Sequence, residues 1–460
     1  METFDVVVIG SGGGSKITRP AASLGKKVAI IEKGRLGGTC LNHGCIPSKM
    51  LIHVADLISE LRETKRFELS VSQEFKVDFK ALVERVSSTI DHDSDSIPPV
   101  YEKDPNITLF RDEAHFLDEH TIEVGGQTIK GKQIVIAAGA RAHIPNIHGL
   151  RDTPYWTYKE ILRNTEQPKS LLVIGGGYIA TELGYFYGAL GTKVDFLVRN
   201  RMIKAEDKDV IDEFESEFSK QFPVHFGHRP VHVSYKNNEF TVITHDNLGH
   251  QTVFTAEKLL VATGFQPNSD TLQLQNTGVK RDDSGNVLVN EHLQTTVDHI
   301  YAFGDILGRY LFRHSANYEG EYVFKRHFEC STLAPIEYPP VPHAIFTHPQ
   351  VGGVGLTEQE CETQNIPYFV GKNNYKASAM GMALRSESGF VKLIFHKETL
   401  VLIGAHIIGP EASNMVHMCI AYMKMKANLN DLLDTIYIHP ALPELIRNAA
   451  RKALIAYHSQ

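Results

Sequence analysis

The 460-residue sequence contains only five cysteines, and it lacks both a basic N-terminal region and an apolar run long enough to span a membrane. The cysteines, at positions 40, 45, 330, 361 and 419, are too few and too scattered for the disulfide framework of a secreted protein. Without a signal peptide or a membrane span, the sequence predicts a cytoplasmic protein with no membrane partner. There is also no excess of positive charge, since the net charge is −7, and so no sign of a nucleic-acid partner.

The chain is too long for one hydrophobic core. At 460 residues and 51.4 kDa it should divide into about three domains. Residues 5–32 and 170–198 each read as an apolar strand, a glycine-rich turn, a helix and a second strand, which predicts two dinucleotide-binding folds. Between them, residues 50–130 predict helices followed by a β-rich stretch. Prolines cluster over residues 335–349, so we place the last boundary near residue 336, with an α+β domain beyond it.

Cys40 and Cys45 are separated by only four residues and follow directly on a glycine-containing segment. A permanent disulfide here would close a very short loop and would add little stability. A reversible disulfide is the better interpretation, because cysteines near helix starts or cations ionise readily and the thiolate is the species that attacks. The pair therefore predicts electron transfer through a disulfide, and no metal site is expected.

The first glycine-rich turn, Gly10-Ser11-Gly12-Gly13-Gly14-Ser15, joins a buried strand to a helix. Such turns let a pyrophosphate approach backbone N–H groups at a helix N-terminus. Ser15 stands where the pattern has its third glycine, and Glu32, at the end of the next strand, can accept a hydrogen bond from a ribose 2′-hydroxyl. A glycine-rich turn without a ligand is the alternative. Pro20, inside the helix, predicts that this helix is shortened or kinked.

The second turn, Gly175-Gly176-Gly177-Tyr178-Ile179-Ala180, has the same plan but a different residue after its second strand. Where an NAD-selective fold carries an acid, this chain has Val198, followed by the cations Arg199, Arg201 and Lys204. A carboxylate there would repel the 2′-phosphate of NADP, whereas cations attract it. We therefore predict NADPH rather than NADH, and the alternative is a solvated basic turn.

The two nucleotide folds, the cysteine pair and the late segment Ala302-Phe303-Gly304-Asp305 occur in one fixed order. The chain thereby resembles, from Val6 to Arg447, the class I pyridine nucleotide-disulfide oxidoreductases, which include dihydrolipoyl dehydrogenase, glutathione reductase and mycothione reductase. The resemblance implies an α/β protein with two Rossmann-like dinucleotide-binding domains and a C-terminal α+β dimerisation domain. It implies bound FAD, a homodimer and the following division: 1–150 and 270–335 form the FAD-binding domain with the central region, 151–269 bind NAD(P), and 336–460 dimerise.

The same resemblance assigns roles to individual residues. It implies that His439 and Glu444 reach across the dimer as an acid–base pair, where a histidine that titrates near neutrality can protonate a leaving thiolate. It implies that Lys49 and Glu182 pair beside the flavin and that Tyr178 gates the nicotinamide pocket; a surface lysine and a helix-surface acid are the alternatives for the first two. The catalytic residues expected are Cys40, Cys45, His439, Glu444, Lys49 and Glu182. The residues expected to bind FAD are Gly10, Gly12, Gly14, Ser15, Glu32, Lys33, Gly38, Thr39, Lys49, Ala138, Gly139, Gly304 and Asp305. Those expected to bind NADP are Gly175, Gly177, Tyr178, Ile179, Glu182, Val198, Arg199, Lys204 and Gly264.

The predicted reaction passes hydride from NADPH to FAD and electrons onward to the Cys40–Cys45 disulfide. Cys45 faces the flavin, and Cys40 attacks a small disulfide substrate. An NADPH-dependent reductase resembling mycothione reductase is the leading prediction. An NAD-dependent dihydrolipoyl dehydrogenase, which oxidises a dithiol and serves a 2-oxoacid dehydrogenase complex, is the first alternative. A flavoprotein subunit without turnover is the alternative from another class.

Overall fold

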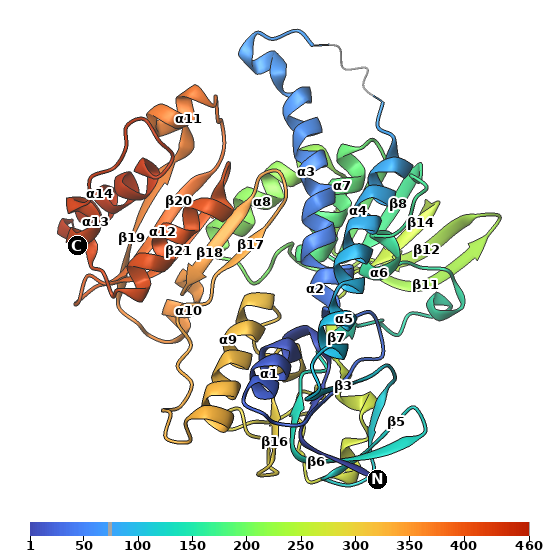
Figure 1. Ribbon diagram of the computed structural model, residues 1–460. Coiled ribbons are helices and arrows are strands. Elements are labelled where there is room, and N and C mark those ends of the chain that lie inside the picture. The colour runs from blue at the N-terminus through green and yellow to red at the C-terminus, as the bar shows by residue number, and fades with distance from the viewer. Residues whose placement is uncertain (72–75, 460) are drawn as a thin grey trace.

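The computed structural model describes residues 1–71 and 76–459, which form three lobes (Figure 1). The N-terminus lies in the lowest lobe of that view, and the C-terminus lies in the lobe on the left. Within the described ranges, none of the helices combines the length and the apolar character that a membrane crossing requires.

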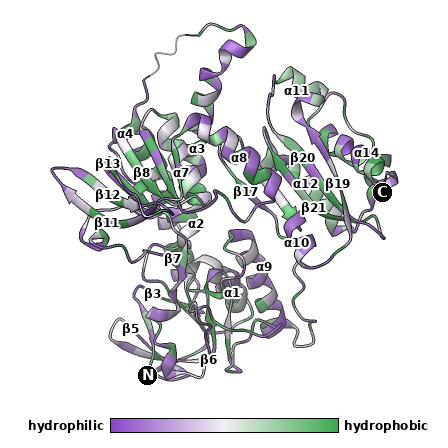
Figure 2. Cartoon of the chain, turned by 180° about the vertical axis from the view of Figure 1, so that it is seen from behind, coloured by the Kyte–Doolittle hydropathy of each residue, from purple (hydrophilic) through white to green (hydrophobic). Residues whose placement is uncertain are grey.

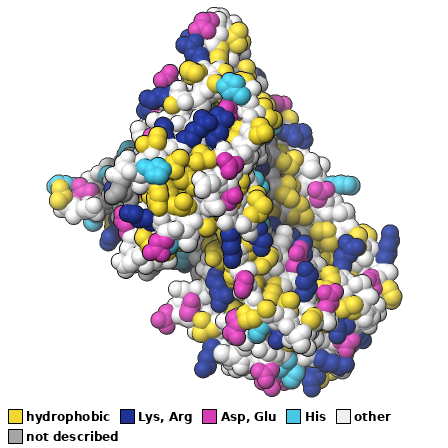
Figure 3. All heavy atoms as spheres, turned by 90° about the vertical axis from the view of Figure 1, so that its left-hand side faces the viewer, with side chains coloured by type: hydrophobic (Ala, Val, Ile, Leu, Met, Phe, Trp, Pro, Cys, Tyr) yellow, Lys and Arg dark blue, Asp and Glu magenta, His cyan; other side chains and the backbone are white. Residues whose placement is uncertain are grey.

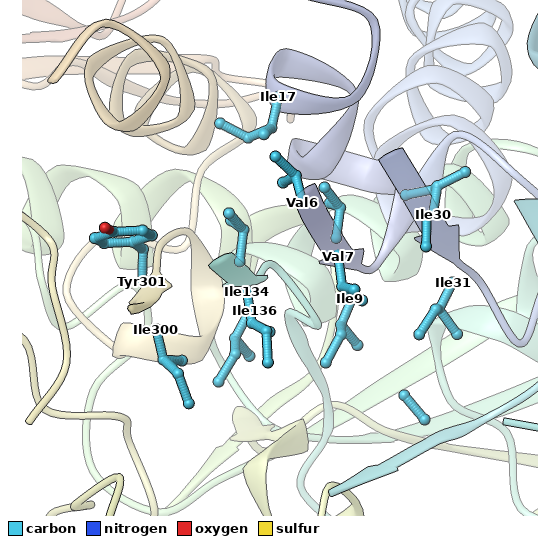
Figure 4. Close-up of a cluster of buried hydrophobic side chains, with 14 of the residues drawn as sticks. Val6, Val7, Ile9, Ile17, Ile30, Ile31, Ile134, Ile136, Ile300 and Tyr301 are labelled. Carbon is cyan, nitrogen blue, oxygen red and sulfur yellow. The ribbon is translucent and has the colours of Figure 1, made fainter. Parts of the chain in front are cut away.

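The lowest lobe, called here the first lobe, is built on a seven-stranded sheet in the order β3-β2-β1-β6-β5-β4, with β16 added beside β6. The pairs that involve β1, β2, β3 and β16 are parallel, and β4, β5 and β6 pair antiparallel. The strands are β1 (Glu2–Ile9), β2 (Val28–Ile31), β3 (Ile107–Phe110), β4 (Ala114–Phe116), β5 (Thr121–Val124), β6 (Gln127–Ile136) and β16 (Ile300–Ala302). Figure 4 shows the apolar side chains of β1, β2, β6 and β16 side by side, which is the packing that continuous apolar strands predict.

Helix α1 (Ser11–Ser23) leaves β1 directly at the glycine turn and packs against α9 (Arg313–Phe324). The predicted shortening of this helix at Pro20 is wrong, because α1 continues through Pro20 to Ser23, and the alternative of a kink stays a prediction. Pro20 lies in the last turn, where its missing N–H deprives only the Lys16 carbonyl of a partner. A π-helical turn (Lys325–Glu329) follows α9.

The second lobe, at the upper right of Figure 1, is called here the nucleotide lobe. Its parallel sheet has the order β10-β9-β8-β14, and an antiparallel sheet β11-β12-β13 lies beside it. The strands are β8 (Ser170–Ile174), β9 (Lys193–Val198), β10 (Val224–Phe226), β11 (Arg229–Lys236), β12 (Glu239–His245), β13 (Gln251–Ala256) and β14 (Lys258–Val261). Its helices are α6 (Tyr158–Ile161), α7 (Tyr178–Ala189) and α8 (Lys208–Gln221). A two-stranded connection, β7 (Ala140–Ala142) with β15 (Phe265–Pro267), links this lobe to the first.

The helices between β2 and β3 reach from the first lobe to the nucleotide lobe. They are α2 (Gly38–His43), α3 (Cys45–Arg62), α4 (Phe79–Asp95) and α5 (Ile97–Glu102). Helix α3 runs beside α7, and its buried side chains share a hydrophobic core with those of the nucleotide lobe (Figure 1). The cysteine pair at the start of α3 is thereby placed between the two lobes.

The C-terminal lobe is an antiparallel sheet, β17-β18-β21-β20-β19, covered by helices. No helix or strand covers residues 330–342, and the boundary predicted near residue 336 falls in this stretch. The strands are β17 (His343–Ile345), β18 (Val351–Gly355), β19 (Tyr368–Asn374), β20 (Phe390–His396) and β21 (Leu402–Ile408). The helices are α10 (Glu358–Thr363), α11 (Ala379–Ala383), α12 (Ala412–Lys424), α13 (Leu429–Asp434) and α14 (Glu444–His458). Figure 2 shows the hydrophobic colour on the inner strands β8 and β20 of the upper two lobes.

Short 3₁₀ segments complete the fold. They cover Thr64–Phe67, Leu150–Asp152, Asn268–Thr271, Leu274–Asn276, Asp305–Leu307 and Tyr375–Ala377.

Candidate active site

A cavity of about 810 Å³ lies where the first lobe meets the nucleotide lobe. Its wall combines the turn after β1, the cysteine segment, the ends of β6 and β14, and the segment after β16. The predicted site residues that line it are Gly10, Gly12, Glu32, Lys33, Gly38, Thr39, Cys40, Cys45, Lys49, Ala138, Gly139, Gly177, Tyr178, Ile179, Glu182, Gly264, Gly304 and Asp305. The fold therefore places most of the predicted site residues around one cavity.

The turn after β1 is shaped so that only glycine fits at its first position. Gly10 has φ +99°, and a Cβ there would lie 2.3 Å from the carbonyl oxygen of Ala137. Gly14 and Ser15 do not reach the cavity: a Cβ on Gly14 would lie 2.6 Å from Val8, and the Ser15 hydroxyl donates to the Gly12 carbonyl. Gly14 therefore allows the close approach of α1 to β1, and the contact of these two residues with FAD stays a prediction.

Glu32 lies at the cavity wall with its carboxylate held in place. One oxygen accepts hydrogen bonds from the Ser11 N–H (3.0 Å) and hydroxyl (2.8 Å), and the other accepts from the Gly34 N–H (2.8 Å). A fixed carboxylate beside a glycine turn suits a ribose hydroxyl. Lys33 instead turns to Glu113, with 2.7 Å between the charged atoms.

The opposite wall carries a second carboxyl group, Asp305, which follows β16. Burial raises its pKa to about 6, the charge of Glu319 adds to this rise, and the charge of Arg313 opposes it. Glu319 is itself buried and accepts a hydrogen bond from the Gly304 N–H at 2.6 Å. A half-buried acid that faces an open cavity suits hydroxyl groups as ligands. With the glycine turn and Glu32, it makes the cavity fit a dinucleotide such as FAD.

Cys40 ends up beside Cys45 because α2 stops at His43 and α3 begins at Cys45. Both cysteines are reduced in this structure. The hydrogen bond from the Cys45 thiol lowers the pKa of Cys40 to about 7 against the effect of burial, and the charges of Arg313 and Lys49 lower it further. The pKa of Cys45 is raised, first by the hydrogen bond to Cys40 and then by withdrawal of its thiol from bulk water. Cys40 is therefore the thiol that ionises first.

We expect the alkylation of Cys40 by iodoacetamide to speed up as the pH rises, because only the thiolate reacts. In the reduced protein the rate should reach half its maximum near pH 7, the value to which the Cys40 pKa is lowered. Peptide mass spectrometry resolves the sites, and buried Cys419, whose pKa burial raises to about 12, serves as the unreactive control. A midpoint for Cys40 above about pH 8.5, the value of a free cysteine, would contradict the assignment.

Lys49, one turn after Cys45, forms an ion pair at the same wall. Its ammonium lies 2.6 Å from Glu182 of α7, and it also lies 4.6 Å from the centre of the Phe346 ring. The other Glu182 oxygen accepts a hydrogen bond from the Phe346 N–H at 3.0 Å. Glu182 thus joins the first lobe, the nucleotide lobe and the C-terminal lobe at the cavity.

The second glycine turn also requires its first glycine. Gly175 has φ +135°, and a Cβ there would lie 2.2 Å from the carbonyl oxygen of Ala262. Val198 is buried at the end of β9, while Arg199 and Lys204 are exposed beyond it; all three, like Gly175, stand outside the cavity wall. Arg201, predicted to attract a phosphate, is bonded instead to Asp212 and Glu215.

His439 and Glu444 form the predicted contact but do not meet the cysteines within one chain. The His439 Nδ1 lies 3.0 Å from a Glu444 oxygen, and the histidine side chain is 70% exposed. Burial would raise the pKa of Glu444, but hydrogen bonds from Ala441 and His439 and the charge of Arg447 lower it. The pair lies outside the cavity wall, so a second chain would have to bring it to Cys40.

Sequence reasoning missed Arg313, at the start of α9. It lines the cavity, its charge lowers the pKa of Cys40, and its guanidinium would lie 3.7 Å from a Cβ on Gly12. The signal available was its position shortly after the Gly304-Asp305 segment. It also missed Glu206 and His343, which contact Tyr178 and each other.

Comparisons with known proteins agree with this arrangement. Residues 4–320 match the family model described as pyridine nucleotide-disulphide oxidoreductase, and residues 341–450 match the dimerisation domain of that family. A mercuric reductase of Staphylococcus aureus is 33% identical over 97% of this chain and 82% of its own length. A mycothione reductase of Mycobacterium tuberculosis is 32% identical (98% and 99% covered), and a dihydrolipoyl dehydrogenase of Haloferax volcanii is 31% identical (98% and 96% covered).

Among solved structures, the HOCl-induced flavoprotein disulfide reductase RclA of Escherichia coli superposes with a TM-score of 0.85 at 25% identity. The match covers 98% of this chain and 99% of that one. With the glycine turns, the cysteine pair and the dimerisation segment in the family's order, the chain belongs to the class I pyridine nucleotide-disulfide oxidoreductases, enzymes that use FAD and NAD(P)H to act on sulfur groups.

Proposed function

We propose that this protein is an NADPH-dependent reductase of a small disulfide, with mycothione reductase as the relative whose activity it most resembles. The observation that carries the choice of NADPH is the end of β9, where buried Val198 replaces a carboxylate and exposed Arg199 and Lys204 follow. Neither cation has an ion-pair partner among the residues that the structure describes. Free cations near a ribose favour a 2′-phosphate.

The residues that would hold FAD are those of the cavity wall, chiefly the Gly10 turn, Glu32 and Asp305. When bound, FAD supplies the chemistry of hydride acceptance from a nicotinamide and two-electron reduction of a disulfide. Lys49 and Glu182 place a fixed charge pair in the wall between the cysteines and the second glycine turn. The chain thereby aligns the reacting groups.

The disulfide chemistry follows from the two thiols. The Cys40 thiolate attacks one sulfur of the substrate disulfide, forms a mixed disulfide and expels the first thiolate, which takes a proton from His439 of a second chain. Cys45 then passes its proton to His439 and attacks the Cys40 sulfur, which re-forms the Cys40–Cys45 bond and releases the second thiolate. His439 returns the proton to that thiolate. One substrate disulfide has then been reduced to two thiols, and the two electrons have come from the cysteine pair.

We propose a homodimer as the working form. The dimerisation model matches residues 341–450, and Ile436 and Ile438, just before His439, are 97% and 81% exposed in the single chain. Hydrophobic side chains also gather on the face of the molecule that Figure 3 shows. Apolar residues exposed to this degree call for a covering partner. We place the dimer in the cytoplasm, where thiol exchange systems of this kind operate.

A dihydrolipoyl dehydrogenase that uses NAD⁺ and serves a 2-oxoacid dehydrogenase complex is the second candidate. It is favoured by the pairing of Arg201 with Asp212 and Glu215, which removes one of the three cations that argue for NADPH. Several dihydrolipoyl dehydrogenases also match at 31% identity.

Steady-state rates with NADPH and NADH, each measured against lipoamide and a panel of low-molecular-weight disulfides, test both candidates. We expect kcat/KM to favour NADPH by at least about tenfold, since one charge-assisted contact contributes about 1.5–3 kcal/mol. Arg199→Ala should reduce this preference through NADPH alone, and Lys193→Ala, at the far end of β9, should leave it unchanged. Equal or better use of NADH, with rapid dihydrolipoamide oxidation, would instead establish the second candidate.

A further inference from the structure

The phenol of Tyr178 is tied to a buried acid outside the glycine turn. Tyr178 is the first residue of α7 and lines the cavity. Its hydroxyl donates a hydrogen bond to one oxygen of Glu206, which is only 1% exposed. The other Glu206 oxygen lies 2.8 Å from the Nε2 atom of His343, in the first position of β17. His343, a side chain of the C-terminal lobe, therefore holds Glu206 in place, and Glu206 in turn holds the Tyr178 hydroxyl.

The Tyr178 ring also contacts two other aromatic rings, which contact each other at 6.5 Å between ring centres. It stacks with Phe312 at 6.3 Å between ring centres and with His343 at 6.2 Å, at interplanar angles of 26° and 29°. Phe312 belongs to the first lobe and His343 to the C-terminal lobe, so side chains of all three lobes meet at this ring. Aromatic contacts of this kind and one hydrogen bond give the ring a single preferred place.

Glu206 has little freedom to move, because the next residue is clamped as well. Asp207 accepts a hydrogen bond from Lys392 of β20 at 2.7 Å, and both side chains are buried. Lys392 also contacts Asp209 and Glu358, so the three neighbouring carboxylates surround an ammonium group and not an open space. Gln359 donates to the Glu206 carbonyl oxygen at 3.1 Å. Buried charges held this firmly do not rearrange without a large cost.

The protonation states agree with the geometry. Burial raises the pKa of Tyr178, and the charge of Glu206 raises it further, so the phenol stays a donor. Burial would raise the pKa of Glu206, but the hydrogen bond from His343 and its charge lower it, so the acid stays a carboxylate acceptor. The contact is therefore a charge-assisted hydrogen bond, the stronger kind.

We propose that Glu206, held by His343, is a positioning residue that keeps the Tyr178 ring in the cavity, so that a nicotinamide ring must break the Tyr178–Glu206 hydrogen bond to enter. The inference rests on the proposed function, since it takes the second glycine turn as the dinucleotide site. The C-terminal lobe thereby sets how tightly the nicotinamide half binds, while the adenine half is unaffected.

The test is equilibrium binding to the oxidised, flavin-loaded protein, with NADP⁺ as the probe and 2′,5′-ADP as the same nucleotide without nicotinamide. In Tyr178→Phe we expect the Kd of NADP⁺ to fall at least about fivefold, because the hydrogen bond no longer opposes entry. In Glu206→Gln the Kd should fall by less, because the amide oxygen still accepts from the phenol but the contact loses its charge. The Kd of 2′,5′-ADP should not change. The double variant should bind NADP⁺ no more tightly than Tyr178→Phe alone, since that change already removes the contact.

Lys372→Ala is the matched control, because Lys372 forms an exposed ion pair with Asp209 between the same two lobes and does not contact Glu206. It should leave both Kd values unchanged. An unchanged Kd for NADP⁺ in Tyr178→Phe, a parallel change for 2′,5′-ADP, additive effects in the double variant, or the same effect in Lys372→Ala would each overturn the proposal. If Glu206→Gln fails to retain flavin, Tyr178→Phe alone decides.

Repeating the series with NAD⁺ and 5′-ADP separates this inference from the proposed function. Tighter binding of NAD⁺ than of NADP⁺ by the unaltered protein refutes the NADPH assignment. The role of Glu206 is still decided by comparing, in each variant, the Kd of the dinucleotide with the Kd of the corresponding ADP.

Discussion

Replacing Cys40 with serine is expected to lower the turnover of every disulfide substrate by about 10³-fold or more, because a serine hydroxyl cannot replace the attacking thiolate. The structure singles out this sulfur: its pKa is lowered to about 7 by the Cys45 thiol, with help from Arg313 and Lys49. Reduction of the bound flavin by the nicotinamide nucleotide should persist, because Cys40 comes after that step. Stopped-flow absorbance of the flavin and steady-state assays measure the two parts separately.

Cys330→Ser is the control for this prediction. Cys330 is exposed, and its sulfur lies 3.3 Å from the Thr332 hydroxyl, away from the cavity wall. We expect this variant to keep full turnover. If Cys40→Ser retained most of its activity with all disulfides and dithiols, the cysteine pair would not carry the reaction, and the protein would be better described as a flavoprotein subunit without disulfide turnover.

Replacing His439 with glutamine should slow disulfide turnover by about 10²- to 10⁴-fold, the usual contribution of a general acid. Glutamine can keep a hydrogen bond to Glu444, so the loss reflects proton transfer and not a broken contact. Flavin reduction should again be unaffected. The matched control is His417→Gln, since His417 is an exposed histidine of α12 whose Nδ1 lies 3.1 Å from the Ser413 carbonyl oxygen.

Mixing the two inactive variants tests whether the site is shared between chains. In a mixed dimer of Cys40→Ser and His439→Gln chains, one site would combine the intact cysteine pair of one chain with the intact His439 of the other. Random mixing makes half of the dimers mixed, each with one intact site of two, so about a quarter of the full activity should return. No recovery after mixing would show that His439 acts within its own chain.

The features that were predicted best from the sequence are those that depend on residues close together in the chain. The two glycine turns and the strands around them follow from local patterns, the contact between His439 and Glu444 follows from the family resemblance, and the structure contains all of them. Pro20 was misjudged because the cost of a helical proline depends on how many turns follow it. Arg201 was assigned to a phosphate because its partners, Asp212 and Glu215, lie on the next helix and only the fold brings them close.

The residues that were missed owe their position to contacts between lobes. Glu206 and His343 are separated by 137 positions, and neither belongs to a pattern with a fixed spacing. From the sequence alone, an acid such as Glu206, just before a helix, is expected to be an ordinary surface residue, and only the fold shows that it is buried. Arg313 likewise becomes part of the site only when α9 packs beside α1. Such residues can be found from the structure and not from the order of the amino acids.

The nucleotide and C-terminal lobes share one hydrophobic core, in which Phe186 and Phe214 join Ile345, Phe390 and Ile408. A polypeptide cut between these lobes would expose this shared surface to water, with Ile345, Val351, Phe390 and Ile408 bared on the C-terminal fragment. Heat or denaturant should accordingly melt both lobes in a single cooperative transition, and the Tyr178 contact would disappear together with the nucleotide fold itself.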